Sequence, residues 1–478
     1  MPLAPNRLKT LLAATGILAL TVAPQLLIAQ SQTWEKLIIP GLTYRMEVDL
    51  GLPRVIHAFR YTPGSGNVFS RPELAGSQVF MPDNATKGRE ALTTTIQTNG
   101  ALAGINADFF PWSGDPIGMM VRQGELISLP FPDRSVFAWG ANYFASSPVK
   151  TTLTVRIGTL QKTVDGLNEE AKDNALTLFT PASGIVRSAT PGTYAVLKTQ
   201  SKLPVSGELT GVVSLVTPDL KTSPIKEDEV ILVATGNQAS VLGSLSKDQS
   251  VTFSVATTGI NPEKTIHAVA GGPRLITASK ITLNSAAEKF PDSFSTTMHP
   301  RTAVGSTASG DIWLVTIDGR QAMSRGSSLD ELARVMQRLG CTEAINLDGG
   351  GSTTLALGAL VLNRPSDNGL ERAICNSILL FGQLPEPVND LTYVIKGVPN
   401  LEEGGTATYT VVDSRGQKVP VNSVIWAAQG AAWIDQSGVL RTLTPGKAKV
   451  SAWIRGKIAS VEIEVIPPVP SGTPPPKI

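Results

Sequence analysis

The sequence predicts an α+β fold, with a mixed, strand-rich α/β domain followed by a small all-β sandwich. Short segments rich in Val, Thr and Ile recur along most of the chain, and its 44 Gly and 34 Pro separate many of them. This pattern is typical of short strands joined by turns. A strand–helix–strand pattern lies within residues 311–352, and residues 393–466 alternate between apolar and polar side chains. These three observations carry the prediction of the fold class.

The N-terminal segment predicts export. Arg7 and Lys9 precede an apolar stretch that ends at Ala29, which is typical of a secretory signal peptide of residues 1–29. The stretch is also long enough for an uncleaved membrane anchor, and Leu27 is larger than the residue usually found two positions before a cleavage site. We expect the protein in the periplasm, at the cell surface or in the medium, with no membrane span beyond this signal.

Composition narrows the possible partners. The chain has 478 residues, of which 42% are hydrophobic and 17% charged, and its formal net charge is +2. No long run of one charge sign occurs, so we expect no nucleic-acid partner.

The two cysteines, Cys341 and Cys375, either form a bridge between neighbouring strands or remain as buried free thiols. Two cysteines and three histidines make a zinc site based on these residues improbable.

Residues 30–385 are expected to form one large domain. Its clearest helix is "SLDELARVMQRLG", where Ser328 caps the N-terminus and Glu331 completes a capping box. A strand, "DIWLVTIDGR", precedes this helix, and "AINLDGGGS" follows it. Parallel pairing of the two strands with a right-handed crossover is the default, so Asp318 and Asp348 would lie at the carboxyl ends of strands. Open α/β sheets bind ligands at such ends.

The segment after Asp348 suits an anion. Three glycines at residues 349–351 can take positive φ and let a ligand approach the backbone. Their N–H groups can form a nest, and Ser352 and Thr353 add hydroxyl donors. The alternative is a tight turn that Asp348 caps and that binds nothing.

The C-terminal part is expected to be a separate small sandwich. Residues 386–392 are a linker, residues 393–466 form the sandwich, and the proline-rich residues 467–478 form a tail. We expect Trp426 and Trp433 in the core of this sandwich.

Seven segments resemble the phosphodiester glycosidase family, which includes the lysosomal enzyme that removes N-acetylglucosamine from a phosphodiester. They occur in the family's order, cover nearly all of residues 40–385, and read "AGINADFF", "PIGMMVRQGELIS", "LTLFTPASG", "AVAGGPRLITASK", "HPRTAVGSTASGDIWLVTIDGR", "SLDELARVMQRLGCTEAINLDGGGSTTL" and "NRPSDNGLERAICNSILLF". The chain departs from the family at Asn106-Ala107-Asp108, where the family usually has Asn-Gly-Gly or Asn-Gly-Asp. The C-terminal part resembles bacterial Ig-like domains of group 2, which suggests attachment or spacing.

The resemblance implies a hydrolase that cleaves the bond between a sugar anomeric carbon and phosphate. Its substrate would be a sugar-1-phosphodiester or a phosphate-linked glycan at the cell surface or outside the cell. Asp348 would be the catalytic base or nucleophile, with Asp318 and Asp108 as partners. The phosphate-binding candidates are Arg301, Arg320, Arg372, Gly349, Gly350, Gly351, Ser352 and Thr353. Asn106 and Phe109 or Phe110 would contact the sugar.

Three alternatives stay open at this point. The three aspartates could instead support a divalent cation, although no cofactor is otherwise expected. The protein could bind glycans without catalysis, as a surface protein. It could also be a phosphodiesterase that cleaves the P–O bond.

Overall fold

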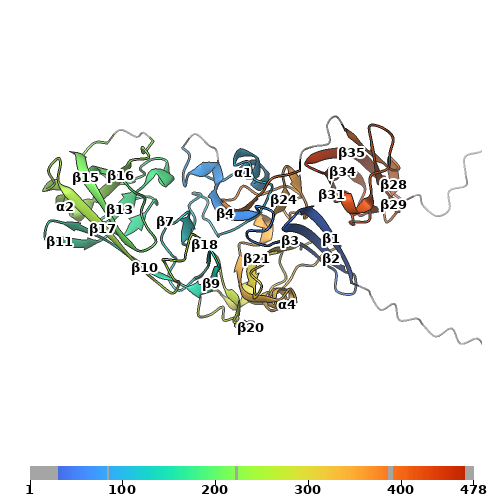
Figure 1. The fold of residues 1–478 in the computed structure, drawn as a ribbon, viewed down its shortest axis with the longest axis horizontal. Coiled ribbons are helices and arrows are strands. Elements are labelled where there is room, and N and C mark those ends of the chain that lie inside the picture. The colour runs from blue at the N-terminus through green and yellow to red at the C-terminus, as the bar shows by residue number, and fades with distance from the viewer. Residues whose placement is uncertain (1–30, 83–85, 221–223, 386–390, 469–478) are drawn as a thin grey trace, which may run out of the picture.

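The structure is a computed structural model that describes residues 31–82, 86–220, 224–385 and 391–468. The predicted signal peptide lies outside these residues, as do most of the predicted linker and tail. The described chain forms three parts in a row, with a β lobe of residues 150–258 at one end and a C-terminal β-module of residues 391–468 at the other (Figure 1). Among the described residues, no helix has the length and apolar character needed to cross a membrane.

The predicted α+β class is wrong, because strands dominate the described chain. The described α-helices are α1 (Leu92–Thr98), α2 (Ala239–Gly243), α3 (Asp292–Thr296) and α4 (Leu329–Arg338). The longest of these, α4, has ten residues, and Ser328 caps it by accepting a hydrogen bond from the Glu331 N–H. The sequence pattern therefore located this helix correctly. One amphipathic helix does not make an α/β layer.

An eight-stranded central sheet contains Arg301, and Asp318 and Asp348 directly follow two of its strands. Its order is β1-β2-β3-β22-β21-β23-β19-β20, and every neighbouring pair is antiparallel. The bounds are β1 (Gln32–Ile39), β2 (Leu42–Asp49), β3 (Arg54–Tyr61), β19 (Arg274–Thr277), β20 (Lys280–Ile281), β21 (Arg301–Thr307), β22 (Ile312–Ile317) and β23 (Cys341–Leu347). Leu332, Val335 and Met336 of α4 pack in the core on one face of this sheet.

The expected direct pairing of the strands around α4 is also wrong. Both β22 and β23 pair antiparallel with β21, so they run parallel to each other with β21 between them. The strand β21 forms a hairpin with β22 and occupies the position beside it, and α4 then carries the chain across β21. Asp318 and Asp348 still follow strands of the same direction, and Arg301 begins the strand that separates them.

Two five-stranded sheets complete the central part. The first, in the order β7-β6-β18-β8-β9, consists of β6 (Met120–Arg122), β7 (Glu125–Ser128), β8 (Ser135–Gly140), β9 (Tyr143–Pro148) and β18 (His267–Ala270). The second, in the order β25-β24-β5-β26-β4, consists of β4 (Phe69–Leu74), β5 (Ala103–Asn106), β24 (Leu355–Leu357), β25 (Leu360–Val361) and β26 (Asn376–Phe381). Ile105, Leu355 and Ile378 join the core of the central sheet, so β5 ends beside β23.

The β lobe is built on one eight-stranded sheet in the order β11-β10-β17-β15-β14-β16-β13-β12. Its strands are β10 (Lys150–Ile157), β11 (Leu160–Thr163), β12 (Gly166–Leu167), β13 (Leu176–Phe179), β14 (Gly192–Thr199), β15 (Gly207–Thr217), β16 (Glu229–Thr235) and β17 (Ser250–Thr258). Its core is continuous with Val121, Val136 and Ala268 of the neighbouring five-stranded sheet.

The C-terminal β-module has three small sheets, β27-β30, β28-β35-β34-β31 and β29-β33-β32. The bounds are β27 (Tyr393–Lys396), β28 (Asn400–Glu402), β29 (Thr406–Thr408), β30 (Thr410–Asp413), β31 (Ile425–Gly430), β32 (Ala432–Ile434), β33 (Val439–Thr442), β34 (Gly446–Ile454) and β35 (Lys457–Ile466). Trp426 is buried within it, while Trp433 and Trp453 belong to the core shared with the central sheet. The resemblance to Ig-like domains stays a prediction.

The two cysteines are free and buried, so the alternative of a bridge is not realised. Cys341 packs in the core beneath α4. The Cys375 thiol lies 3.9 Å from the Asp108 carbonyl oxygen.

Candidate functional site

Asp348 and Asp108 meet although 240 residues of chain separate them. Asp348 follows β23, and its N–H donates to the Ala107 carbonyl at 2.9 Å. Asp108 lies beyond β5, and its two carboxylate oxygens accept from the N–H groups of Phe109 at 2.7 Å and Gly118 at 2.8 Å. The Asp108 side chain is buried, whereas Asp348 is partly exposed. The edge where β5 meets β23 therefore presents two neighbouring carboxylates.

Asn106 holds this edge together. Its Nδ2 donates to the Asp348 carbonyl at 2.6 Å, and its Oδ1 accepts from the Thr302 hydroxyl and the Thr354 N–H, each at 3.0 Å. The side chain is buried. The structure thus gives Asn106, predicted to contact the sugar, a position from which it orients the backbone of Asp348.

Burial raises the pKa of both carboxylates. Burial raises the pKa of Asp108 to about 7, the N–H donors and Arg134 oppose the rise, and the Asp348 charge adds to it. Burial also raises the pKa of Asp348 to about 6, against the opposing effects of the Ser352 hydroxyl, the Arg372 charge and the Gly349 N–H. Near neutral pH, Asp348 is mostly ionised while Asp108 keeps a proton for much of the time. A pair of acids with pKa values pushed apart can divide the roles of base and acid.

The glycine segment turns back on itself and uses several of its N–H donors within the protein. Gly350–Ser352 form a single 3₁₀ turn. The N–H of Gly350 donates to the Pro300 carbonyl at 2.9 Å, and those of Ser352 and Thr353 donate to Gly349 and Gly350 at 3.2 Å. These donors are used within the protein. The Thr353 hydroxyl accepts from Thr302 at 3.3 Å and also faces inward.

The glycines instead leave room for two arginines. A Cβ atom on Gly351 would lie 2.0 Å from a guanidinium nitrogen of Arg372, and one on Gly350 would lie 3.2 Å from Arg320. Arg320 is exposed, and 34% of the Arg372 side chain is accessible. Both guanidinium groups therefore flank the segment that follows Asp348, with surface available to an anion.

A third cation lies beneath these two. Arg301 is buried, its Nε donates to the Ser327 carbonyl at 2.9 Å, and its Nη2 donates to the carbonyls of Phe294 and Thr297 at 2.6 and 2.8 Å. Burial, with the nearby Arg320 charge, lowers the pKa of Arg301 to about 10. The structure thus uses Arg301 to anchor α3, and its charge adds to a positive region.

His299 belongs to the same positive region. Its Nδ1 lies 3.2 Å from Arg320 Nη2. Burial and the charges of Arg320 and Arg301 lower the pKa of His299, which favours the neutral ring that can accept from Arg320.

Aromatic rings gather beside Asp108. The centroid of Phe109 lies 5.8 Å from that of Phe290 and 6.0 Å from that of Phe294. The Arg134 guanidinium lies over Phe109 at 5.4 Å and over Phe290 at 4.4 Å. Phe110 instead packs against the small core around α1. Of the two predicted phenylalanines, Phe109 is the one that joins this group.

A pocket of about 520 Å³ opens next to the aromatic group. Phe131, which lies 4.5 Å beneath the Arg134 guanidinium, forms part of its wall. Ile117 forms another part, and its N–H donates to the Phe109 carbonyl at 3.1 Å.

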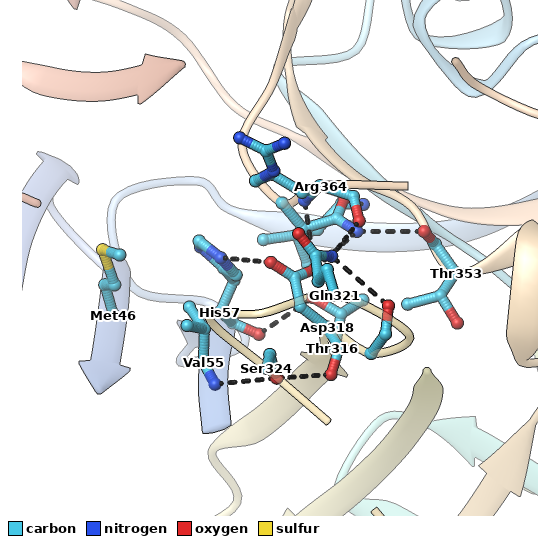
Figure 2. Close-up of polar contacts among 12 residues, drawn as sticks. Met46, Val55, His57, Thr316, Asp318, Gln321, Ser324, Thr353 and Arg364 are labelled. Carbon is cyan, nitrogen blue, oxygen red and sulfur yellow. Dashed lines mark hydrogen bonds and ion pairs between the residues drawn. The ribbon is translucent and has the colours of Figure 1, made fainter. Parts of the chain in front are cut away.

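Asp318 occupies a separate buried position (Figure 2). Its Oδ1 accepts from Asn363 Nδ2 at 3.2 Å and from the Arg364 N–H at 3.0 Å. Its Oδ2 lies 3.4 Å from His57 Nε2, and His57 Nδ1 bonds the Tyr44 hydroxyl at 2.8 Å. Only 1% of Asp318 is exposed. The structure thus places Asp318 where it can hold the turn that carries Arg320.

The three predicted aspartates do not form one cluster. Within residues 31–82, 86–220, 224–385 and 391–468, no group of three or more His, Cys, Asp or Glu side chains has the arrangement needed for a metal ion. Asp108 and Asp348 remain together, and Asp318 lies apart with His57.

Sequence reasoning missed several residues of this region. Asn363 and Arg364 lie within a quoted segment, "NRPSDNGLERAICNSILLF", but a polar pair in a loop gives no sign that it binds a buried aspartate. Phe290 precedes α3, Phe294 lies within this short helix, and Arg134 follows a turn, and no sequence motif marks any of the three. These three residues join the site only because the fold brings them next to Phe109.

The comparisons with known proteins agree with the central part of this region. Residues 205–381 match the phosphodiester glycosidase family. The matched segment includes Asp318, Arg320, Asp348 and Arg372, and it leaves Asp108 outside.

Curated relatives match over short segments. The chain is 35% identical over 82 residues to the SPbeta prophage-derived uncharacterized protein YomE of Bacillus subtilis (strain 168), which is 17% of this chain and 13% of that protein. It is 41% identical over 75 residues to the N-acetylglucosamine-1-phosphodiester alpha-N-acetylglucosaminidase of Mus musculus, which is 16% of this chain and 14% of that enzyme. The chain thus spans a small part of these relatives.

Solved structures share the fold over a longer stretch. A hypothetical protein from Synechocystis superposes with a TM-score of 0.58 at 24% identity, over 72% of this chain and 62% of that chain. A presumed exported protein from Burkholderia pseudomallei K96243 superposes with a TM-score of 0.54 at 21% identity, over 69% and 74%. Residues 205–381 are thus similar to phosphodiester glycosidases in sequence, and the longer superpositions show a shared fold.

Proposed function

We propose that this protein is an exported phosphodiester glycosidase that hydrolyses the bond between a sugar anomeric carbon and phosphate. One observation carries the proposal: Asp348 and Asp108, both with raised pKa values, lie next to a turn flanked by Arg320 and Arg372. Carboxylates suit an anomeric centre that develops positive charge, and exposed guanidinium groups suit a phosphate. The family match at residues 205–381 supports the same chemistry.

Each of these four residues has a role in the proposed reaction. Arg320 and Arg372 neutralise the phosphodiester, which makes the phosphate a better leaving group. Asp348, ionised near neutral pH, acts as base toward water or as nucleophile at the anomeric carbon. Asp108 remains protonated for part of the time and can return a proton to the leaving oxygen. The bond between the anomeric carbon and oxygen breaks, water supplies the new hydroxyl, and a phosphate monoester leaves.

Phe109 and the rings beside it would form one face of the sugar site. Aromatic faces pack well against the apolar C–H face of a sugar ring. The adjoining pocket of about 520 Å³ gives space for a further part of a glycan. The substrate is therefore proposed to be a phosphate-linked glycan or a smaller sugar-1-phosphodiester at the cell surface or outside the cell.

Hydrolysis in water labelled with oxygen-18 tests the proposal. The purified protein is incubated with a panel of sugar-1-phosphodiesters and with the matching methyl glycosides, and mass spectrometry locates the label. We expect cleavage of the phosphodiesters alone, with the label in the free sugar. Label in the phosphate would make the protein a phosphodiesterase. Binding of the panel without any turnover would make it a glycan-binding protein.

A further inference from the structure

The C-terminal β-module contacts the loop of residues 363–367, which in turn contacts Arg320 and Arg372. Arg364 directs its guanidinium away from Asp318 (Figure 2). Its Nη2 donates to the Gly430 carbonyl at 2.9 Å and its Nη1 to the Ala432 carbonyl, on β31 and β32 of the module. Gln429 Nε2, at the end of β31, donates in turn to the Asn363 carbonyl at 2.9 Å. Hydrogen bonds thus link the module to residues 363 and 364 in both directions.

The main chain of Arg364 then fixes the turn that carries Arg320. Its N–H donates to Asp318 Oδ1 at 3.0 Å, and its carbonyl accepts from Gln321 Nε2 at 3.0 Å. These partners lie two residues before and one residue after Arg320. Arg320 itself has a positive φ of 60°, a backbone conformation that needs support from its surroundings. A third bond joins Arg320 Nη1 to the Ser366 hydroxyl at 3.4 Å.

The same loop also fixes Arg372. Asp367, three residues after Arg364, accepts from Arg372 Nε at 2.9 Å and forms an ion pair with its Nη2 at 2.7 Å. A side-chain pair at this level of exposure contributes little on its own, so its geometry depends on where the loop places Asp367. Residues 363–367 therefore connect the module to both guanidinium groups that flank Gly350 and Gly351.

We infer that the C-terminal β-module is a positioning part of the phosphate site, and that Arg364 and Gln429 are the residues through which it acts. The inference rests on the proposed function in assigning Arg320 and Arg372 to the phosphate. A module that only attached or spaced the protein would need no contact with this loop. Here its strand ends supply hydrogen-bond partners to the loop that contacts both arginines.

Two measurements test the inference on the full-length mature chain. The first is the affinity for inorganic phosphate by isothermal titration calorimetry. The second is KM and kcat for a sugar-1-phosphodiester. The variants are Arg364→Ala and, from the module side, Gln429→Ala. Arg441→Ala is the matched control, because Arg441 is an exposed arginine on β33 of the same module. Melting temperatures identify any variant that fails to fold.

We expect Arg364→Ala to weaken phosphate binding and raise KM about tenfold, since small displacements of positioning groups have effects of this size. The value of kcat should fall by a smaller factor than KM rises, because the arginines bind the phosphate in the ground state and also stabilise it as the leaving group. Gln429→Ala should show a smaller effect in the same direction, Arg364→Lys an intermediate one, and Arg441→Ala none. In an Arg320→Gln background, Arg364→Ala should weaken phosphate binding less than in the wild type, because the two residues act through one group.

Unchanged phosphate affinity and KM in folded Arg364→Ala and Gln429→Ala would overturn the inference and leave the proposed function intact. Weaker phosphate binding in both variants, with no hydrolysis by any form, would support the inference and remove the proposed function. A wild type that neither binds phosphate nor hydrolyses the substrate would overturn both. Additive effects of Arg364→Ala and Arg320→Gln would also contradict positioning through Arg320.

Discussion

At the residue scale, the site depends on two carboxylates whose pKa values burial raises above the ordinary value of 3.8. Asp108 and Asp348 have pKa values of about 7 and about 6. If Asp348 acts ionised and Asp108 acts protonated, kcat/KM has its maximum between pH 6 and pH 7 and falls about tenfold per pH unit on either side. In Asp108→Asn, which cannot ionise, the decrease above pH 7 should disappear. The pH profiles of the two proteins test this, and a basic limb that persists in Asp108→Asn would assign it to another group.

The same pKa shift predicts how stability depends on pH. The folded pKa of Asp348 lies above its ordinary value of 3.8, so its contribution to stability is fully present below about pH 4 and is lost as pH rises through about 6. Asp348→Asn has no charge to bury, so it should gain on the order of 1–2 kcal/mol relative to the wild type between pH 5 and pH 8. Urea unfolding of both proteins at the two pH values measures the gain. An equal decrease in the free energy of unfolding of both proteins from pH 5 to pH 8 would contradict this prediction.

The sequence predicted which residues belong to the site better than it predicted what each of them does. It singled out Asp348, Asp108, Arg320 and Arg372, which the structure places around one turn. The strand pattern paired Asp318 with Asp348, and the family resemblance added Asp108 to the same group. Burial and bonds to Asn363 and His57 separate Asp318 from them, and sequence carries no record of such contacts.

At the element scale, the turn after β23 requires glycine, because a side chain there would meet the neighbouring arginines. A Cβ atom at Gly351 would lie 2.0 Å from Arg372 and 2.4 Å from Asp367. Since Arg372 is a flexible side chain, Gly351→Ala should displace the guanidinium and lower kcat/KM about 10- to 100-fold, the loss of a hydrogen bond to a charged group. Gly243→Ala is the matched control, because a Cβ there would meet nothing within 4 Å. Equal kinetics for the two variants would show that Arg372 takes no part in the reaction.

The local sequence pattern did not reveal the order of the strands in the central sheet. The capping box and apolar face located α4 within one or two residues. They could not show that β21 pairs between β22 and β23, because that pairing comes from hydrogen bonds between segments about 40 residues apart. The fold class was wrong for the same reason: a helix between two strands implied a parallel α/β unit, whereas antiparallel hairpins build the central sheet.

At the scale of the whole molecule, the C-terminal β-module and the central sheet share one core. Trp453 of the module is 6% exposed and packs in the cluster that contains Tyr44 and Phe59 of the central sheet. Trp453→Ala should therefore destabilise the central sheet together with the module, by about 3–5 kcal/mol. Trp112→Ala is the control, since Trp112 is 75% exposed, and its effect should stay below about 0.5 kcal/mol. A separate early transition of the module in calorimetry, with the main transition unchanged, would contradict a shared core.

The sequence predicted strands through residues 393–466 but not what the module contacts. Its strands are short and regular, so alternation reveals them. The hydrogen bond from Gln429 to Asn363 joins strand β31 to a loop 66 residues away in the sequence, and it exists only once two separate sheets have packed together. For the same reason, the meeting of Asp108 with Asp348 was expected only through a family resemblance.

The most direct test of the central claim is the release of free sugar from an N-acetylglucosamine-1-phosphodiester by the purified mature chain, with folded Asp348→Asn as the matched protein. The proposed function predicts release by the wild type and a decrease of about 10³-fold in Asp348→Asn, within the range for loss of an acid or base. Equal release by both proteins would remove Asp348 from the chemistry. No release by either protein, across several sugar-1-phosphodiesters and with divalent cations added, would contradict a glycosidase.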